Sequence, residues 1–479
     1  MLLTFCTYSF SQKQANIWYF GSNAGVNFNS GSPVALLNGQ NNALEGTSVI
    51  SDSVGSFLFY SDGMAVWNKN HQVMLNGTNL LGNTSATQSS IAVPDPNNPN
   101  RYYYLFTVSS GFAGGDMSDG LRYSKIDMCL DSARGAIIPA EKNIILVDTV
   151  AEKIAVTRHA NGIDYWILTH KFFSDQFWAL HLSASGIIDT VVTAIGSSHS
   201  GNIAGSQGQL KFSANGQKIA IAASNNLNLL ELFDFNKTTG AVSNFQPLNR
   251  LNNGNVYGTE FSPDGSILYA VSWSFSPFGM DVTQYNLNAG NLAAINASLN
   301  SVYNETTAIA GRGLQAAPDG KIYMVSLSNA STLAVINNPN VYGTGCNFQD
   351  QSISLAGQLG QYNLPGFIAG FDYSNGIINC DIITVTEIPC GDLFIPTAFS
   401  PNNDGVNDFE FVFGNCIQAE SFYFAIYDRW GEKVFETTDQ TKGWDGTYKG
   451  KTLNTAVFVY YLRAKLLTGE EISKKGNVS

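Results

Sequence analysis

The sequence has few charged residues for its length. Asp, Glu, Lys and Arg make up only 13% of the 479 residues, and the formal net charge is −12. A protein that binds nucleic acid usually presents a basic face to the phosphates, so this composition argues against a nucleic-acid partner. Low charge together with 46 glycines and 12% aromatic residues is typical of an exported all-β protein rather than a cytosolic helical one.

Long apolar runs are also missing. No segment after the N-terminus has the roughly 18 uninterrupted apolar residues of a membrane span, and no long stretch shows helical spacing of apolar residues. Residues 1–11, MLLTFCTYSFS, are short and apolar, and they end in small residues. They are expected to be a signal peptide, truncated because it lacks a basic start, with cleavage near Ser11. A buried first strand is the alternative.

The motifs of common enzyme classes are absent. There is no GxSxG, GxGxxG or phosphate loop, the five histidines never take HExxH spacing, and no cysteines form CxxC. We therefore assign no catalytic residues and no cofactor; enzymatic activity stays open, with its absence favoured. Two of Glu45, Asp62 and Glu260 could meet across a central channel as a glycosidase-like pair, or each could cap a turn. His170 follows an apolar run and is expected to be a structural or rim histidine.

What the sequence does contain is a repeat. A Pro-Asp-Gly or Asn-Gly turn followed by a short apolar strand recurs six times between Ser51 and Val325. In the clearest copies Gly162, Gly216, Gly265 and Gly320 are 54, 49 and 55 residues apart. Such turns supply the positive φ angles of a tight β-hairpin, and a period near 50 residues with room for four strands predicts a propeller blade.

The repeat predicts an all-β fold whose first domain, residues 15–378, is a seven-bladed β-propeller. Strand-like segments at 16–37 and 364–371 lack their own turn motif. We expect these two ends to share one blade that closes the ring, which protects the sheet edges. A ring of six or eight blades is also compatible with the spacing.

A change of pattern near 379–390 predicts a linker before a second domain at 391–479. Residues 422–427 and 457–464 alternate as strands, and several Gly-rich turns separate them. Closely spaced strands within about 90 residues favour a small Ig-like β-sandwich.

Four ordered motifs in this second domain resemble a known family. The stretches are 395–408 (IPTAFSPNNDGVND), 427–436 (YDRWGEKVFE), 443–451 (GWDGTYKGK) and a closing strand with Gly469 and 474–476 (KKG). They are similar to the gliding-motility-associated C-terminal domain, the type B sorting domain of type IX secretion in Bacteroidetes. The motif residues matched are Pro401, Asn402, Asp404, Gly405, Asn407, Asp408, Arg429, Trp430, Gly431, Trp444, Asp445, Gly446, Lys474, Lys475 and Gly476.

The resemblance implies export through the periplasm to the medium or the outer cell surface, with the type IX translocon as a partner. Segments 57–63, 120–124 and 258–265 also look like the propeller-type passengers joined to such domains. Lys474 and Lys475 are candidate translocon contacts, or charges that protect an edge strand.

Two further features of the second domain have alternative interpretations. Asn402, Asp404 and Asp408 place oxygen ligands around a glycine turn and are a calcium candidate, although an Asx-turn that orders the strand start is favoured. Trp430 and Trp444 are expected to pack in the core or at its edge, with translocon contact as the alternative.

Covalent features complete the predictions. Cys390 and Cys416 flank a short loop and are expected to form a disulfide in an oxidising compartment, with Cys346–Cys380 a weaker pair and Cys129 free. Asp-Ser/Thr-apolar triplets resemble the O-glycosylation signal of Bacteroidetes exported proteins. In these triplets Ser53, Ser132, Thr149 and Thr190 are the candidate glycan acceptors, and all four are expected near turns.

Three functions remain compatible with these patterns. The favoured one is a secreted or surface protein whose propeller binds an extracellular glycan or protein through its loops. A polysaccharide-active enzyme and a structural or adhesive component linked to gliding motility are the alternatives.

Overall fold

The structure is a computed structural model of the chain. It describes residues 13–370 and 393–479, except 225–226, 252–253, 277, 308–309, 403, 405–406, 415–416 and 467. The chain divides into two compact units, Met1–Cys380 and Asp381–Ser479, called here the propeller unit and the C-terminal unit. In the parts described, no helix has the length and apolar character needed to cross a membrane.

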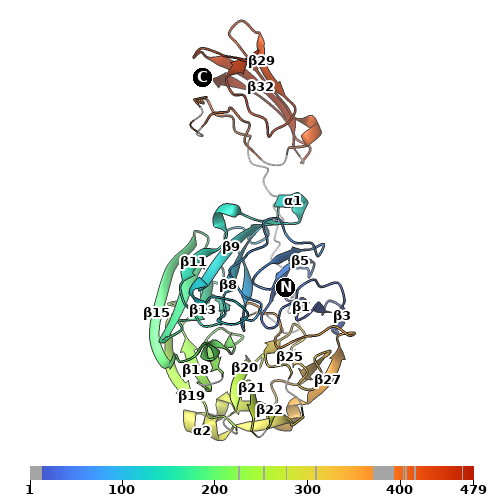
Figure 1. Cartoon of the computed structure of the whole chain (residues 1–479), viewed down its shortest axis with the longest axis vertical. Coiled ribbons are helices and arrows are strands. Elements are labelled where there is room, and N and C mark those ends of the chain that lie inside the picture. The colour runs from blue at the N-terminus through green and yellow to red at the C-terminus, as the bar shows by residue number, and fades with distance from the viewer. Residues whose placement is uncertain are drawn as a thin grey trace, which may run out of the picture. The chain divides into compact units, whose positions relative to one another are not determined.

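The described part of the propeller unit contains seven antiparallel sheets, each made of consecutive strands (Figure 1). The first three blades contain β1 (Ile17–Phe20), β2 (Ala24–Asn27) and β3 (Val34–Leu36); β4 (Ser48–Ser51), β5 (Phe57–Ser61) and β6 (Val66–Asn68); and β7 (Ser90–Pro94), β8 (Tyr102–Val108), β9 (Leu121–Asp127), β10 (Ala136–Ile137) and β11 (Ile144–Val147).

The other four blades have four strands each. They contain β12 (Ala155–Arg158), β13 (Tyr165–His170), β14 (Ser174–Ser183) and β15 (Gly186–His199); β16 (Leu210–Phe212), β17 (Lys218–Ala223), β18 (Leu229–Phe235) and β19 (Val242–Pro247); β20 (Asn255–Phe261), β21 (Ile267–Phe275), β22 (Phe278–Asn286) and β23 (Asn300–Glu305); and β24 (Leu314–Ala316), β25 (Ile322–Val325), β26 (Thr332–Ile336) and β27 (Phe348–Ser354).

Helices in the described residues are short. They are α1 (Leu130–Ala133) and α2 (Leu292–Ala297), with the 3₁₀ turns η1 (Met117–Asp119), η2 (Pro139–Glu141), η3 (Ile203–Ser206), η4 (Leu287–Ala289), η5 (Gly343–Cys346) and η6 (Ala419–Ser421). The predicted all-β class is therefore confirmed.

The repeat motif forms the first hairpin of a blade, as expected. Between β20 and β21 the Asp264 carboxylate accepts hydrogen bonds from the Ser266 N–H (2.9 Å) and the Ser262 hydroxyl (2.7 Å), and Gly265 takes φ +72°. These local bonds fix the turn, so that the apolar residues after it enter β21 on the correct face.

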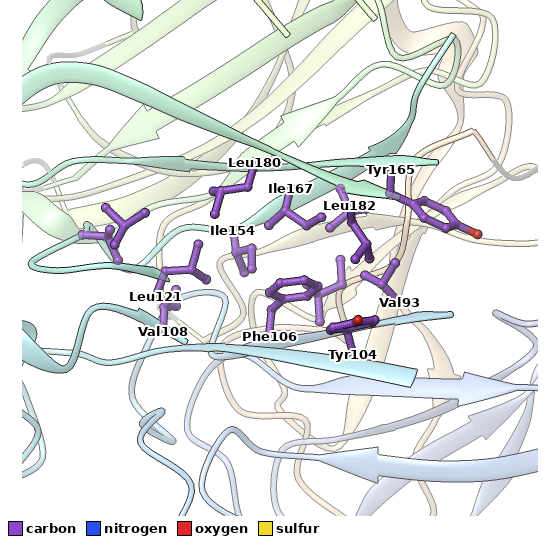
Figure 2. Packing of buried hydrophobic residues seen from close by; sticks show 14 of the residues in the cluster. Val93, Tyr104, Phe106, Val108, Leu121, Ile154, Tyr165, Ile167, Leu180 and Leu182 are labelled. Atoms are coloured by element: carbon purple, nitrogen blue, oxygen red, sulfur yellow. The ribbon is translucent and has the colours of Figure 1, made fainter. Parts of the chain in front are cut away.

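Apolar clusters between neighbouring blades hold the ring together. Figure 2 shows one of them, which includes Phe106 of the third blade and Ile167 and Leu180 of the fourth. Every neighbouring pair of blades shares such a buried cluster. Each fully buried large apolar side chain contributes about 1.5–3 kcal/mol, so these clusters are the main source of stability.

The number of blades agrees with the prediction of seven, but the predicted shared blade is wrong. β1–β3 form the first blade and β24–β27 the last, and neither includes a strand from the other end. The ring closes by face packing, with Trp18 of β1 lying edge-on to Tyr323 of β25 at 6.1 Å between ring centroids.

The late segment 359–370, the central segment, does not join a blade. Leu359 bridges Ser22 and Asn23 of the first blade, Gly366 bridges Ser48 of the second, and Ala369 bridges Thr157 of the fourth. The segment thus makes isolated bridges to different blades and forms no regular ladder with any of them.

The C-terminal unit has a four-stranded sheet in the order β29-β28-β32-β33 and a small hairpin β30-β31. Its strands are β28 (Tyr423–Tyr427), β29 (Lys433–Thr437), β30 (Thr447–Tyr448), β31 (Lys451–Thr452), β32 (Phe458–Lys465) and β33 (Glu471–Val478). Bridges Phe394–Phe413 and Glu410–Trp444 add irregular extended segments, and a separate apolar core contains Phe424, Trp444 and Leu462.

Candidate functional site

Residues just before the first strands of two blades place polar side chains around the ring centre. The Gln88 side chain accepts the Leu210 N–H at 2.8 Å and donates to its carbonyl at 3.0 Å, joining the third blade to the fifth. The Gln209 side-chain oxygen accepts the N–H groups of Thr259 and Leu314, both at 3.0 Å. Because these amides are buried, each unmade bond would cost about 1–3 kcal/mol.

Asn363 of the central segment completes this network. Its side chain is 1% exposed, donates to the Thr87 carbonyl at 2.7 Å and accepts from Gln209 Nε2 at 3.0 Å. The neighbouring Tyr362 carbonyl accepts the N–H groups of Arg312 and Gly313 at 2.9 and 3.0 Å. The central segment therefore occupies the axis where many propellers keep a channel.

Beside this segment lie Glu45, Glu152 and Lys153, all fully buried. Glu45 accepts a hydrogen bond from the Tyr257 hydroxyl, and burial together with nearby Glu152 raises the pKa of Glu45 to about 8. Glu152 accepts from Ser110 at 2.8 Å and Ser206 at 3.0 Å, and burial also raises its pKa.

Lys153 donates to the Ser206 carbonyl, and burial lowers the pKa of Lys153 to about 7. Burial therefore favours neutral forms in this cluster, because the uncharged states need less solvation. Glu45, Glu152 and Lys153 each have hydrogen-bond partners in the protein. None of the three lines the cavity described below. These groups therefore hold the ring centre together and are poorly placed to act on a substrate.

The three carboxylates singled out from the sequence have separate partners. Asp62 accepts the N–H groups of Met64 and Ala65, both at 2.9 Å, as a turn cap does. Glu260 pairs with Lys211 at 2.9 Å. The carboxylate near Glu45 is Glu152, which the repeat pattern did not predict. The signal available in the sequence was a charged Glu-Lys pair within the otherwise apolar stretch 150–156, which could have indicated a buried polar site.

His170 is buried within the fourth blade, and its ring stacks on the His199 ring with centroids 3.9 Å apart. Both ring nitrogens of His199 are buried, and neither has a hydrogen-bond partner among the described residues. Burial, reinforced by nearby Lys153, lowers the pKa of His170 to about 3 and the pKa of His199 well below its usual value.

This pair predicts a loss of stability in mild acid. A histidine whose pKa is lower in the folded state binds a proton preferentially when unfolded, so its stability contribution is full above pH 6.5 and falls as the pH drops toward 3. Between pH 7.5 and 5 we expect His170 to lower the free energy of unfolding by about 2 kcal/mol, and His199 to act in the same direction. Urea unfolding of wild type and His199→Leu should show a smaller acid loss in the variant.

A control variant isolates the buried ring. His71 is partly exposed on the second blade, where Asn38 contacts its Nε2 at 2.8 Å. His71→Leu should therefore keep most of the acid loss. An unchanged acid loss in His199→Leu would show that the buried pair does not set the pH dependence.

A cavity of about 310 Å³, here the turn-face cavity, opens among the first hairpin turns of the second, third and fourth blades. Its lining includes Asp52, Asn100, Tyr103, Arg158 and Tyr165, together with residues 368–370 of the central segment. In the part of the chain that the structure describes, neither tyrosine hydroxyl has a hydrogen-bond partner. The cavity thus combines two aromatic faces with free hydroxyls, a cation and a carboxylate.

The residues of the first sorting motif form a loop. The Asn402 N–H donates to Asp408 at 3.0 Å, and the Asn402 side-chain amide donates to Asp404 at 2.8 Å. The Asn402 side-chain oxygen accepts the Asp404 N–H at 3.1 Å, as in an Asx-turn, and the Asn407 carbonyl accepts the Ser400 N–H at 2.8 Å. Gly405 lies outside the described residues, and calcium binding here stays a prediction.

The two tryptophans have opposite environments. Trp444 is 1% exposed, lies 4.8 Å from Phe458 between ring centroids, and donates to the Thr447 carbonyl at 2.9 Å. Trp430 is 80% exposed at the turn between β28 and β29. The packing prediction is therefore right for Trp444 and wrong for Trp430, because a hairpin tip leaves no apolar surface for the ring to cover.

The remaining motif residues hold turns or the sheet edge. Gly431 and Gly446 take φ +82° and +75°, and Asp445 accepts the Thr447 N–H at 2.9 Å. The cation of Arg429 lies over the Trp430 ring at 5.0 Å.

Lys474, Lys475 and Gly476 belong to β33, the last strand of its sheet. Lys474 donates to the Leu393 carbonyl at 2.6 Å, whereas Lys475 is exposed beside Tyr461. A side chain at Gly476 would collide with the Tyr460 ring. Lys475 is thus the freer of the two lysines for an external contact.

The predicted covalent sites are partly visible. Cys390, Cys416 and Cys380 lie outside the described residues, while Cys129 is exposed and Cys346 buried, both as free thiols. Three of the four predicted glycosylation residues are exposed and Thr149 is half-buried; Thr190 lies within strand β15, which corrects its expected place near a turn.

Comparison with known proteins agrees with the division of the chain into a propeller unit and a C-terminal unit. Residues 393–479 match the family model of the CHU_C type IX secretion signal domain. These residues form a type IX secretion signal domain, and the protein is exported to the cell surface or secreted. A search of the curated proteins gives no significant match.

Solved propeller structures similar to the chain are distant in sequence. A 6-phosphogluconolactonase candidate from Bacteroides uniformis shares 14% identity with a TM-score of 0.45, and the match covers 72% of this chain and 99% of that one. The periplasmic gluconolactonase of Pseudomonas aeruginosa shares 9% identity with a TM-score of 0.41, and the match covers 73% of this chain and 98% of that one. Identities this low transfer no activity to this chain.

Proposed function

We propose that the exported propeller binds an extracellular glycan in the turn-face cavity. The observation that supports this best is the pair of tyrosines that line the cavity, Tyr103 and Tyr165, whose hydroxyls have no hydrogen-bond partner among the described residues. Sugars present hydroxyl groups and apolar ring faces together, and tyrosine offers a hydrogen-bonding group and an aromatic face to match them.

The electrostatics of the cavity suit a neutral polar ligand. Burial, with Asp52 and Tyr165 close by, raises the pKa of Tyr103, so its hydroxyl stays protonated and can donate. Arg158 lies over the Tyr165 ring at 5.8 Å and donates to the Gly162 carbonyl at 2.8 Å, which fixes its position at the wall. A volume of about 310 Å³ fits one or two sugar rings at the lower end of ligand-pocket sizes.

Removing both hydroxyls tests this site. A glycan array first identifies the glycan that the wild-type protein binds. The double variant Tyr103→Phe with Tyr165→Phe should bind that glycan about 10-fold or more weakly, since two hydrogen bonds of roughly 1 kcal/mol each are lost. Tyr461→Phe, in the C-terminal unit, should bind like the wild type.

Three outcomes on the array would contradict the proposal. Equal binding by the double variant would place the ligand elsewhere. Binding of a protein but no glycan would contradict the ligand class. Absence of any glycan bound by the wild type would leave the cavity without its proposed role.

We also propose that the C-terminal unit has an Ig-like fold. We propose further that this unit contacts the secretion machinery through the tip of the β28–β29 hairpin. The support is the exposure of Trp430 with Arg429 stacked over it, because an exposed aromatic beside a cation is typical of binding surfaces. The exposed Lys475 on β33 provides a second candidate contact.

A further inference from the structure

Three potential metal ligands meet at the edge of the fourth blade. His159, Asp164 and His181 each offer a ligand atom, and these atoms lie within 4.8 Å of one another. In the parts of the chain described, they are the only group of at least three His, Cys, Asp or Glu residues with this geometry. The spacing of 5 and 17 residues matches no standard metal-binding motif, so sequence patterns alone do not predict this group.

The backbone brings these residues together. His159 and Asp164 stand at the two ends of the turn between β12 and β13, which is closed by hydrogen bonds from the His159 N–H to the Asp164 carbonyl (2.8 Å) and from the Gly162 N–H to the His159 carbonyl (3.0 Å). His181 pairs with Trp166 across β13 and β14. A site fixed by one turn and one strand pair needs little rearrangement to bind an ion.

The distances between ligands suit a single ion. His181 Nε2 lies 3.0 Å from Asp164 Oδ2, and the rings of His159 and His181 stack at 4.7 Å between centroids. Ligand bonds of about 2.0–2.1 Å to zinc in a tetrahedron place neighbouring ligand atoms a little over 3 Å apart. With Nε2 at the Thr238 carbonyl, His159 would bind the ion through Nδ1, which must first release the Asn161 N–H that it accepts at 3.1 Å.

Neighbouring groups orient the ligands. The Asn161 side-chain amide donates to Asp164 Oδ2 at 2.8 Å, and His159 Nε2 lies 3.2 Å from the Thr238 carbonyl of the fifth blade. Trp166 stacks near His181 at 4.8 Å and donates to the Lys237 carbonyl at 2.7 Å. Such outer contacts set ring orientation in metal sites, and here they also join two blades.

The ligand set selects the kind of ion. Two imidazoles and one carboxylate suit zinc and similar divalent transition metals, whereas calcium prefers oxygen ligands alone. The side chains of His181 and Asp164 are 15% and 14% exposed, so an ion can enter and a water can take a fourth position.

We propose that His159, Asp164 and His181 form a binding site for one divalent transition-metal ion of the zinc type. Binding replaces the hydrogen bond between His181 Nε2 and Asp164 Oδ2 by a bond from each atom to the ion, and the displaced proton goes to solvent. The bound ion links the turn of the fourth blade to the strand beside it and, through the Thr238 contact, to the fifth blade. The site does not depend on what the turn-face cavity binds.

The test uses full-length, tag-free protein after chelator treatment. Calorimetric titration with zinc chloride at pH 7.5 should show one equivalent bound, and the same titration with calcium chloride should show none. The double variant His159→Ala with His181→Ala should lose this equivalent, and Asn161→Ala should weaken binding by about 10- to 100-fold. His71→Ala should bind like the wild type.

Cobalt provides a second measurement that does not depend on heat. Visible absorption of a tetrahedral Co²⁺ complex should appear with the wild type and with His71→Ala and be absent from the double variant, whose fold is checked by circular dichroism. If the double variant is unfolded, Asp164→Asn should reduce both signals in a folded chain. The proposal is wrong if the wild type binds no zinc stoichiometrically, or if folded ligand variants bind it with unchanged affinity.

Discussion

Replacing Gly313 with alanine is expected to lower the free energy of unfolding of the propeller by roughly 3–5 kcal/mol. A Cβ atom at Gly313 would lie 1.3 Å from the side-chain oxygen of Asn363. Both groups are held by backbone and buried hydrogen bonds, so the new methyl must displace Asn363. That displacement breaks the bonds of Asn363 to Thr87 and Gln209 and leaves buried polar atoms without partners.

A glycine of the central segment provides the matched control. At Gly366 a Cβ atom would meet nothing closer than 3.8 Å, an ordinary contact. Gly366→Ala should therefore change the free energy of unfolding by less than about 1 kcal/mol. Urea unfolding of the two variants separates the effects, and a Gly313→Ala protein as stable as Gly366→Ala would contradict the position of the central segment.

Deleting residues 393–479 is expected to abolish export and leave the propeller in the periplasm. This segment carries the whole match to the secretion signal domain, and it has its own apolar core. The propeller closes through the cluster that contains Trp18 and Tyr323. Cell fractionation should find the truncated protein folded but retained.

Two tryptophan variants show what the secretion machinery requires of this domain. Trp444→Ala removes a fully buried ring and should destabilise the domain by about 3–5 kcal/mol, so export should fall with folding. Trp430→Ala removes an exposed ring and should leave stability nearly unchanged. Reduced export of a stable Trp430→Ala protein would support the hairpin tip as a contact.

The repeat predicted the blades because a blade is determined locally. Asp264 and Gly265 fix a turn through bonds within five residues, and the same pattern recurs at a regular period. The closure could not be predicted in this way. Whether 364–370 joins a blade or crosses the ring centre depends on partners such as Thr47 and Val156, which lie hundreds of residues earlier.

The same distinction separates the sites that were predicted from those that were missed. The sorting motifs are contiguous, so the sequence revealed them directly. Glu152 and the group of His159, Asp164 and His181 acquire their roles from neighbouring blades and strands, which no spacing rule encodes. Trp430 shows a further limit, since the same residue type beside glycine is buried at Trp444 and exposed at the hairpin tip.

The most direct test of the central claim, that the C-terminal unit directs export, is to transfer it to another protein. A fusion of residues 381–479 to a periplasmic fluorescent reporter is produced in a host with type IX secretion, beside the full-length chain. We predict that the reporter reaches the medium or the cell surface and that the same host without a working type IX system retains it. A reporter that stays in the periplasm while the full-length chain is exported would contradict the claim.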